Sequence, residues 1–416
     1  MEEIHVLGKS SLKGSVSVQG SKNAALPMMA ASLLHRGISV LKGCPAISDV
    51  FCMEEILRSL GAVTWWKDHD LYLDCTNAEK TEIPAFYTGK MRSSVILLAP
   101  VLSRNKTCSI GYPGGCVIGK RPVDLHLMAL RNLGVRILET QQLLIAHCEN
   151  MTGAEIIFPR SSVGATQQAL LAAVLAQGET VLINCAREPE IVWLCRYLRS
   201  MGARIEGEGS STVLVHGVKE LGPGNFKVPP DRIVAGTYIC AAAATGSEIE
   251  LKGVLVEELG AFLEVYRKIG GQYEAKSGTL MVNGKEAVHP VELVETGAYP
   301  GFPTDLQSPL TAVLIGIPGR STVRENIFED RFQAAFQMKK MGAHIEINGR
   351  DAVIEGGISL SGCVLQAKDL RGGAALILAA MQASGETCIR GANYISRGYE
   401  HICEDLESLG CEIWQT

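Results

Sequence analysis

The strongest constraint on the fold is an internal repeat that occurs six times along the chain. In each copy a stretch with the apolar spacing of a surface helix ends at a glycine, and an alternating, strand-like run follows. Glycine just past a helix favours a left-handed cap, so the pattern predicts helix, cap and strand. The six glycines are Gly61, Gly134, Gly202, Gly270, Gly342 and Gly410.

Each copy also contains an earlier stretch that is apolar or small on nearly every side, which is typical of a helix buried all round. After several of these stretches a glycine turn leads into a β-like run, for example 178–184 and 385–391. We therefore predict an α/β protein whose unit is buried helix, strand, surface helix, strand. The predicted buried helices are 23–34, 93–103, 164–176, 233–244, 306–316 and 372–383.

Two global arrangements of six units are open at this point. A solenoid would offer only a surface for binding, but these units are longer than common solenoid repeats. The length of 416 residues suits two or three domains, so two domains of three units each is the favoured organisation.

Composition excludes several classes of function. Apolar residues make up 47% and charged residues 20%, which is typical of a globular protein. The net charge of −5 gives no overall electrostatic reason to bind nucleic acid or an anionic membrane. The first residues lack a signal-peptide pattern, and no apolar run is long enough to span a bilayer. We expect a cytoplasmic protein with no membrane insertion, no nucleic acid partner and no obligatory protein partner.

The 13 cysteines are scattered, without a C-x-x-C pair or a nearby histidine cluster. This spacing predicts no metal site, and a disulfide scaffold does not suit a large chain without a secretion signal. We expect most cysteines to be reduced, buried and inert, and we expect no cofactor.

Charged residues recur where the predicted helices start. A basic residue there opposes the helix dipole, but together with free N–H groups it makes a site for an anion. A single one of them could be a solvated surface charge, whereas the set predicts a small substrate with at least one phosphate or carboxylate. The residues are Lys22, Arg92, Arg232, Asp305 and Arg371 at the buried helices, and Arg121, Glu188, Arg331 and Arg397 near the surface helices.

One cysteine stands apart in its surroundings. In the segment 111–127, four glycines and two prolines accompany Cys116, and Lys120 and Arg121 follow it. Such a stretch cannot be a helix or a central strand before Pro122, so we expect an exposed loop. Positive charge near a thiol increases its reactivity and suits it to proton transfer near neutral pH. Cys116 is therefore a candidate reactive residue, although composition alone leaves an inert thiol equally open.

Long motifs in a fixed order now carry a family resemblance over nearly the whole chain. The chain resembles the enolpyruvyl transferase family, which includes EPSP synthase, and within it the UDP-N-acetylglucosamine 1-carboxyvinyltransferases. The motifs are GSKNAALP from residue 20, MRSS from 91, GGCVIGKRPVDLHL from 114, SVGAT from 162, AREPEIV from 186, PDRI from 230, YPGFPTDLQ from 299, ENIFEDRF from 325, DLRGGAAL from 369 and SRGYE from 396.

The resemblance implies an architecture, an inside-out α/β barrel of two domains with three units around buried helices in each. Residues 22–229 would form domain 1 with the Cys116 loop, and residues 1–21 and 230–416 would form domain 2. The active site would lie in the cleft between them, which would close on substrate.

The implied reaction moves the enolpyruvyl group of phosphoenolpyruvate to the 3′-hydroxyl of UDP-N-acetylglucosamine and releases phosphate, by addition and elimination, at the first committed step of peptidoglycan synthesis. Cys116 would donate the proton and would react with a fosfomycin-like epoxide, and Asp305 would be the general base. Helix capping is the alternative role for Asp305. Lys22, Arg121 and Arg397 would bind phosphate and carboxylate.

The remaining implied contacts line the cleft. Arg331 and Arg371 would be further polar residues there, and Glu188, Glu190, Asp231 and Arg232 would lie in or behind it. The nucleotide sugar would contact Asn23, Arg92, Arg121, Pro122, Val123, Asp124, Leu125, Ser162, Val163, Gly164, Asp305 and Ile327.

One departure and two alternatives remain. Gly372 and Gly373 replace a stretch richer in alanine and serine in the family, which puts the local helix in doubt. The chain could instead be the shikimate 3-phosphate enolpyruvyl transferase, which shares the fold but not the cysteine loop. It could also be an idle paralogue that only binds a UDP-sugar.

Overall fold

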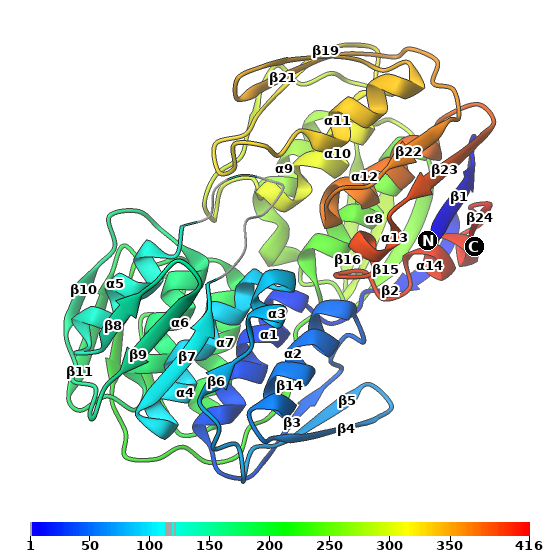
Figure 1. Cartoon of the computed structure of the whole chain (residues 1–416). Helices are drawn as coiled ribbons and strands as arrows, with labels where there is room; N and C mark the ends of the chain where they lie inside the picture. Colours follow the sequence, from blue (N-terminus) through cyan, green and yellow to red (C-terminus); the bar gives the residue numbers. More distant parts are fainter. Residues whose placement is uncertain (1, 113–118, 120–121) are drawn as a thin grey trace. The chain divides into compact units, whose positions relative to one another are not determined.

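The computed structural model describes residues 2–112, 119 and 122–416 of the chain (Figure 1). They form two compact units. Unit 1 contains residues 2–19, 119 and 230–416, and unit 2 contains residues 20–112 and 122–229. Each unit has its own hydrophobic core. That these units act as the two domains of the implied enzyme, with the active site between them, stays a prediction.

All six sheets have the same topology, a parallel pair of strands followed by two antiparallel neighbours. In strand order, the sheets of unit 2 are β14 (Asn225–Lys227), β3 (Ile38–Lys42), β5 (Asp70–Asp74), β4 (Val63–Lys67); β6 (Glu82–Ile83), β7 (Thr107–Gly111), β9 (Leu143–His147), β8 (Arg136–Glu139); and β10 (Glu155–Ile157), β11 (Glu179–Ile183), β13 (Thr212–His216), β12 (Arg204–Glu206).

Unit 1 repeats this plan with strands from both ends of the chain. The N-terminal strand β1 is the third strand of the last sheet, and β2 is the first strand of another. The sheets are β2 (Lys13–Ser17), β15 (Glu248–Lys252), β17 (Thr279–Asn283), β16 (Gln272–Lys276); β18 (Val294–Glu295), β19 (Gly319–Arg324), β21 (Asp351–Gly356), β20 (His344–Asn348); and β22 (Val364–Gln366), β23 (Glu386–Arg390), β1 (Glu3–Leu7), β24 (Ile413–Gln415).

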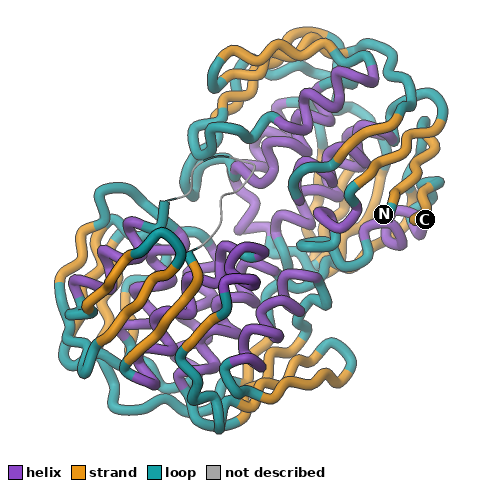
Figure 2. Tube along the Cα trace, in the orientation of Figure 1, coloured by secondary structure: helices purple, strands orange, loops and turns teal. Residues whose placement is uncertain are grey.

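The predicted buried helices are confirmed, and within each unit they lie inside while the strands lie outside (Figure 2). This arrangement follows from their sequences, because a helix that is apolar on all sides must be covered on all sides. They are α1 (Lys22–Ala31), the 3₁₀ turn η2 (Arg92–Leu97) with α4 (Leu98–Asn105), and α6 (Val163–Ala173) in unit 2, and α8 (Arg232–Thr245), the 3₁₀ turn η4 (Thr304–Leu306) with α10 (Gln307–Leu314), and α12 (Leu370–Ala380) in unit 1.

The surface helices also end where the sequence predicts. All six signature glycines have positive φ, between 90° and 107°, as a left-handed cap requires. The predicted unit is incomplete in one respect, because each sheet has four strands rather than two. The surface helices are α2 (Ser48–Ser59), α5 (Asp124–Asn132), α7 (Pro189–Ser200), α9 (Gly260–Lys268), α11 (Gln333–Met338) and α14 (Ile402–Ser408), and two short helices, α3 (Ala85–Lys90) and α13 (Ala392–Ile395), complete the set.

The two glycines that put helix α12 in doubt are accommodated. Asp369 caps this helix, and its Oδ1 accepts a hydrogen bond from the backbone N of Gly372 at 2.8 Å. A Cβ at Gly373 would lie 2.6 Å from Ile395 of α13. The glycine therefore permits close packing of α13 on α12, and this packing offsets the low helix propensity of glycine.

The cysteines among the described residues are all free thiols, and most are buried. Over the same described part of the chain, no helix combines the length and the apolar character that crossing a bilayer requires.

Candidate functional site

A carboxylate held between two buried arginines is the main polar feature of unit 1. Asp305 lies in η4, at the entry to the buried helix α10. Its Oδ1 accepts a hydrogen bond from Arg331 Nη2 at 2.7 Å, and its Oδ2 accepts one from Arg371 Nε at 3.3 Å. The arginines are 4% and 2% exposed, whereas the Asp305 side chain is 28% exposed. The carboxylate is thus the accessible end of a buried charge cluster.

The two arginines retain unused hydrogen-bond donors. Among the described residues, Arg331 Nε and Arg371 Nη1 and Nη2 are buried without an acceptor. Burying a cation and leaving its donors unpaired costs free energy, so such a place suits an anionic ligand that supplies the acceptors.

Arg371 keeps its charge although it is buried. Burial by itself lowers its pKa, but the nearby Tyr399, Asp305 and Asp231 raise the pKa well above the ordinary value for arginine. The guanidinium lies 5.3 Å from the centre of the Tyr399 ring, in a cation–π contact. Tyr399 is itself held by a hydrogen bond of 2.8 Å between its hydroxyl and Thr237. These contacts fix the position of the guanidinium.

A buried glutamate shapes the loop that leads to Arg331. Glu325 Oε1 accepts hydrogen bonds from the backbone N of Ile327 and of Phe328, at 2.8 and 3.0 Å. Its Oε2 accepts one from Thr304 Oγ1 at 2.9 Å, next to Asp305. Glu325 therefore links the Asp305 turn to the loop that carries Ile327, which is exposed.

Other predicted residues of unit 1 lie at helix starts. Asp231 is buried and caps α8, because its Oδ1 accepts hydrogen bonds from the backbone N of Ile233 and Val234. Arg232 lies 5.9 Å from the ring centre of Tyr299. Arg397 is half-buried in the segment between α13 and α14.

Unit 2 places a lysine at the start of its first buried helix. Lys22 begins α1, and its Nζ lies 3.1 Å from Asp49 Oδ2 in the first turn of α2. The two side chains are 13% and 6% exposed. Asn23 and Arg92, at the starts of α1 and η2, are half-buried.

A second polar group of unit 2 lies at the starts of α5 and α6. Arg160 Nη2 donates to both carboxylate oxygens of Asp124, at 3.0 and 2.7 Å. Partial burial alone raises the pKa of Asp124, but the hydrogen bond from Arg160 holds that pKa below the ordinary value. Ser162 caps α6, and a Cβ at Gly164 would lie 2.5 Å from His126 Nε2. A side chain at this position would displace the His126 ring, so glycine lets the ring approach the backbone closely.

The structure brings some predicted residues together and leaves others undescribed. It joins Asp305, Arg331 and Arg371 in unit 1. Among the predicted contacts of the nucleotide sugar, Val123 and Leu125 are buried, Val163 is half-buried and Pro122 is exposed. The half-buried Glu188 and the buried Glu190 lie at the start of α7. Cys116 and Arg121 lie outside the described residues.

Four residues that support the candidate site were not singled out from the sequence. Asp49 looks like an ordinary acid in the first turn of a helix, and Arg160 looks like a surface charge. Tyr399 and Glu325 were visible only as parts of longer motifs. In each case the contact joins segments at least 21 residues apart, or a buried side chain to backbone, and spacing along the chain gives no signal of it.

Comparison with known proteins agrees with this fold. The family model described as EPSP synthase (3-phosphoshikimate 1-carboxyvinyltransferase) matches residues 6–406. A UDP-N-acetylglucosamine 1-carboxyvinyltransferase 2 of Caldanaerobacter subterraneus subsp. tengcongensis is 41% identical over 413 residues, covering 99% of both chains. The protein of the same name from Bacillus subtilis is 38% identical, covering 100% of this chain and 97% of that one.

Solved structures show the same architecture. The enolpyruvyl transferase NikO from Streptomyces tendae superposes with a TM-score of 0.90 at 25% identity, covering 100% of this chain and 99% of that one. An EPSP synthase from Acinetobacter baumannii has a TM-score of 0.74 at 20% identity over the full length of both chains, which supports the fold alone. The predicted fold class is confirmed, and the chain belongs to the enolpyruvyl transferase family that the EPSP synthase model describes.

Proposed function

We propose that this chain transfers the enolpyruvyl group of phosphoenolpyruvate to the 3′-hydroxyl of UDP-N-acetylglucosamine, with release of phosphate. Relatives named UDP-N-acetylglucosamine 1-carboxyvinyltransferase 2 match this chain over nearly their full length at about 40% identity. The observation that carries the proposal is the Asp305 carboxylate, which two buried arginines with unused donors hold at the start of a buried helix.

The reaction has three chemical needs. In the addition step the sugar oxygen forms a bond to C2 of the enol, the hydroxyl loses its proton, and C3 gains one. In the elimination step C3 loses a proton and phosphate leaves from C2, which restores the double bond. The enzyme must therefore accept one proton, deliver another, and hold the phosphate and carboxylate throughout.

Asp305 fits the role of proton acceptor. Arg331 and Arg371 each donate to a different oxygen of its carboxylate, so its orientation is fixed from two sides. The side chain is partly exposed, so a substrate hydroxyl has access to it. The unused guanidinium nitrogens of both arginines are donors for substrate oxygens in the same place.

Cys116 would deliver the proton to C3, and Lys22, Arg121 and Arg397 would bind the phosphate and carboxylate. For Lys22 the structure adds Asp49, whose carboxylate pairs with the ammonium group at 3.1 Å. The nucleotide sugar would contact Asn23, Arg92, Pro122, Val123, Asp124, Leu125, Ser162, Val163, Gly164 and Ile327. These roles, the shared site for residues of both units and the cytoplasmic location belong to the proposal.

Phosphate release on mixing substrates tests the proposal. With phosphoenolpyruvate and UDP-N-acetylglucosamine, the full-length protein should release one phosphate for each enolpyruvyl product. Release with shikimate 3-phosphate in place of the nucleotide sugar would overturn the proposal in favour of the shikimate relative. Binding of UDP-N-acetylglucosamine without any turnover would show an idle paralogue.

A further inference from the structure

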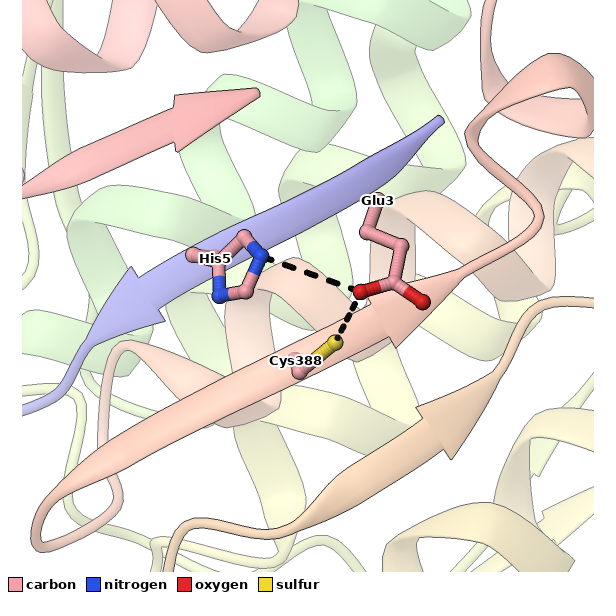
Figure 3. Close-up of side chains that lie close together, drawn as sticks. All are labelled: Glu3, His5 and Cys388. Atoms are coloured by element: carbon pink, nitrogen blue, oxygen red, sulfur yellow. Dashed lines mark hydrogen bonds and ion pairs between the residues drawn. The ribbon is translucent and has the colours of Figure 1, made fainter. Parts of the chain in front are cut away.

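Three potential metal ligands of different types meet on the last sheet of unit 1 (Figure 3). Glu3 and His5 lie on β1, and Cys388 lies on β23 directly opposite His5 in the antiparallel register. One ligand atom from each of the three lies within 4.8 Å of the others. Strand pairing creates this cluster between residues at opposite ends of the sequence, which is why cysteine spacing predicted no metal site.

The distances between these ligand atoms suit a tetrahedrally coordinated ion after small side-chain movements. Cys388 Sγ lies 3.2 Å from Glu3 Oε2, and His5 Nε2 lies 3.9 Å from the same oxygen. When Zn²⁺ is bound at about 2.0–2.3 Å, neighbouring ligand atoms of a tetrahedron lie roughly 3.3–3.8 Å apart.

His5 is oriented as metal-binding histidines usually are. Its Nδ1 lies 2.8 Å from Glu386 Oε1, and its ring stacks on Trp414 with centroids 5.3 Å apart. A proton on Nδ1, donated to Glu386, leaves the lone pair on Nε2, the nitrogen nearer to Glu3. A carboxylate behind the ligating imidazole is the common outer arrangement in metal sites, where it fixes the tautomer and the ring orientation.

Glu3 can bind an ion without losing its ion pair with Arg390. Arg390 Nε donates to Glu3 Oε1 at 3.0 Å, whereas Cys388 donates to Oε2. Without metal, Cys388 Sγ donates its hydrogen to Glu3 Oε2, so this residue is a thiol. Metal binding breaks the S–H bond, forms a bond between sulfur and the ion, and releases one proton to solvent. The thiolate and the carboxylate then neutralise a divalent charge.

We propose that Glu3, His5 and Cys388 bind a divalent transition metal ion of the zinc type, with Glu386 positioning His5. One nitrogen, one oxygen and one sulfur ligand favour Zn²⁺ or Co²⁺ over Mg²⁺ or Ca²⁺, which take oxygen ligands. The ion ties the N-terminal strand β1 to β23 and so fastens the start of the chain to unit 1. This site contains none of the residues of the proposed active site.

Titration of the full-length protein with Co²⁺ tests the site directly. A thiolate-to-cobalt charge-transfer band should appear, and Cys388→Ser should abolish it. Cys363→Ser removes another half-buried thiol of the same unit and should leave the band unchanged, as should Cys116→Ser. Glu386→Gln should keep the band but weaken Co²⁺ binding by about 10- to 100-fold. Absence of the band in the wild type, or its survival in Cys388→Ser, would overturn the proposal.

Thermal unfolding provides a second readout that does not depend on cobalt. Added Zn²⁺ should raise the Tm of the wild type and of Cys363→Ser but not that of Cys388→Ser or His5→Gln. The metal-free Tm of each variant shows whether it folds. An equal rise of Tm in wild type, Cys388→Ser and His5→Gln would mean that Zn²⁺ binds elsewhere and would refute the assignment.

Discussion

Units 1 and 2 share one topology, but they hold their cations differently. In unit 1, Arg331 and Arg371 are 4% and 2% exposed and converge on one carboxylate. In unit 2, Lys22 and Arg92 are half-buried, and Arg160 is exposed. A repeated fold thus supplies equivalent helix starts, and local burial decides how firmly a charge is fixed there.

The difference has an energetic meaning. A buried arginine stays in place only if its charge is compensated, so Asp305 and Tyr399 are part of what fixes the cluster of unit 1. Such a frame does not reorganise when charge develops on a ligand. A half-buried lysine that pairs with a carboxylate can exchange this partner for a ligand at lower cost than a fully buried arginine can. In the proposed active site, the Asp305 cluster of unit 1 would then be the fixed part, and Lys22 of unit 2 would be the adjustable part.

Asp305→Asn should have the largest effect. Asparagine keeps the shape of the side chain but leaves two buried arginines without this counter-charge and removes the proposed proton acceptor. We expect kcat to fall by about 10²- to 10⁴-fold, the usual range for loss of a general base. The measurement is phosphate release at saturating concentrations of both substrates.

The matched control is Asp330→Asn, an exposed position in the same unit, which should keep wild-type activity. If Asp305→Asn also kept kcat within twofold, the buried cluster would have no role in the chemistry, and the contrast between the units would concern stability alone.

The reactivity of the thiols should distinguish Cys116 from the described cysteines of both units. Burial raises the pKa of Cys75 and Cys195 in unit 2 and of Cys403 in unit 1 to about 12. Compared with an ordinary thiol of pKa about 8.5, their thiolate fraction at neutral pH is lower by roughly 10³-fold. We therefore expect a fosfomycin-like epoxide to modify Cys116 and to leave these three intact until the pH approaches 12 or the protein unfolds.

Peptide mass mapping after brief exposure to the epoxide gives the site of modification. Cys116→Asp should lose the adduct while keeping some capacity for proton donation. An adduct on a described cysteine, or continued alkylation of Cys116→Asp, would contradict the assignment of the reactive thiol.

Lys22 and Asp49 test whether unit 2 is the adjustable part. Lys22→Gln removes a charged donor, and a charged hydrogen bond contributes about 1.5–3 kcal/mol, so kcat/KM for phosphoenolpyruvate should fall roughly 10- to 100-fold. Asp49→Asn keeps the ammonium group and removes only the negative charge of Asp49 beside it, so the loss should be about tenfold or less. Glu55→Gln, an exposed change on the same helix α2, is the control.

The relative losses of kcat/KM in Lys22→Gln and Asp49→Asn decide whether Lys22 is adjustable or fixed. An Asp49→Asn loss as large as that of Lys22→Gln would show that the lysine of unit 2 depends on fixed orientation as much as the arginines of unit 1 do.

The repeating parts of the fold could be predicted because they are local. A glycine with positive φ after each surface helix and an apolar surface on each buried helix leave a signal within one window of sequence. The strands that join a sheet from a distant part of the chain leave no such local signal. β14 pairs with β3 and β1 with β23, and these pairings depend on how the ends of each unit meet.

The candidate site divides in the same way. The sequence predicts that Asp305 and Arg371 lie at the starts of buried helices. Their contact with each other and with Arg331 joins residues up to 66 positions apart, and only the family resemblance placed the three residues in one site. Arg160 and Asp49 were missed because each looks like an ordinary helix-surface charge until the partner is seen.

The smallest expected effect concerns two buried tyrosines that have different partners in the two units. In unit 2 the Tyr197 hydroxyl lies 3.2 Å from the neutral Ser32 Oγ, whereas in unit 1 the Tyr238 hydroxyl donates to the Asp405 carboxylate. Burial raises the pKa of Asp405 above its ordinary value, and Glu404 and Glu400 add to the rise, while Tyr238 and His401 oppose it. The stability of unit 1 should therefore depend on the pH, through Asp405, in a way that the pair of unit 2 does not share.

The sign follows from linkage. A carboxyl with a raised pKa binds its proton more tightly in the folded state, so its contribution to stability is complete below the unfolded pKa and is lost as the pH rises through the folded value. Asp405→Asn removes this loss and keeps an acceptor for Tyr238, so the Tm of the variant minus that of the wild type should increase between about pH 4 and 7. Ser32→Ala should lower the Tm by an amount that does not vary with pH, because it removes only neutral hydrogen bonds, to Tyr197 and to the backbone O of Met28, of about 1 kcal/mol each. A Tm difference for Asp405→Asn that stays flat across this range would mean that the half-buried Asp405 carboxyl of unit 1 carries no greater electrostatic cost than the Ser32 hydroxyl of unit 2.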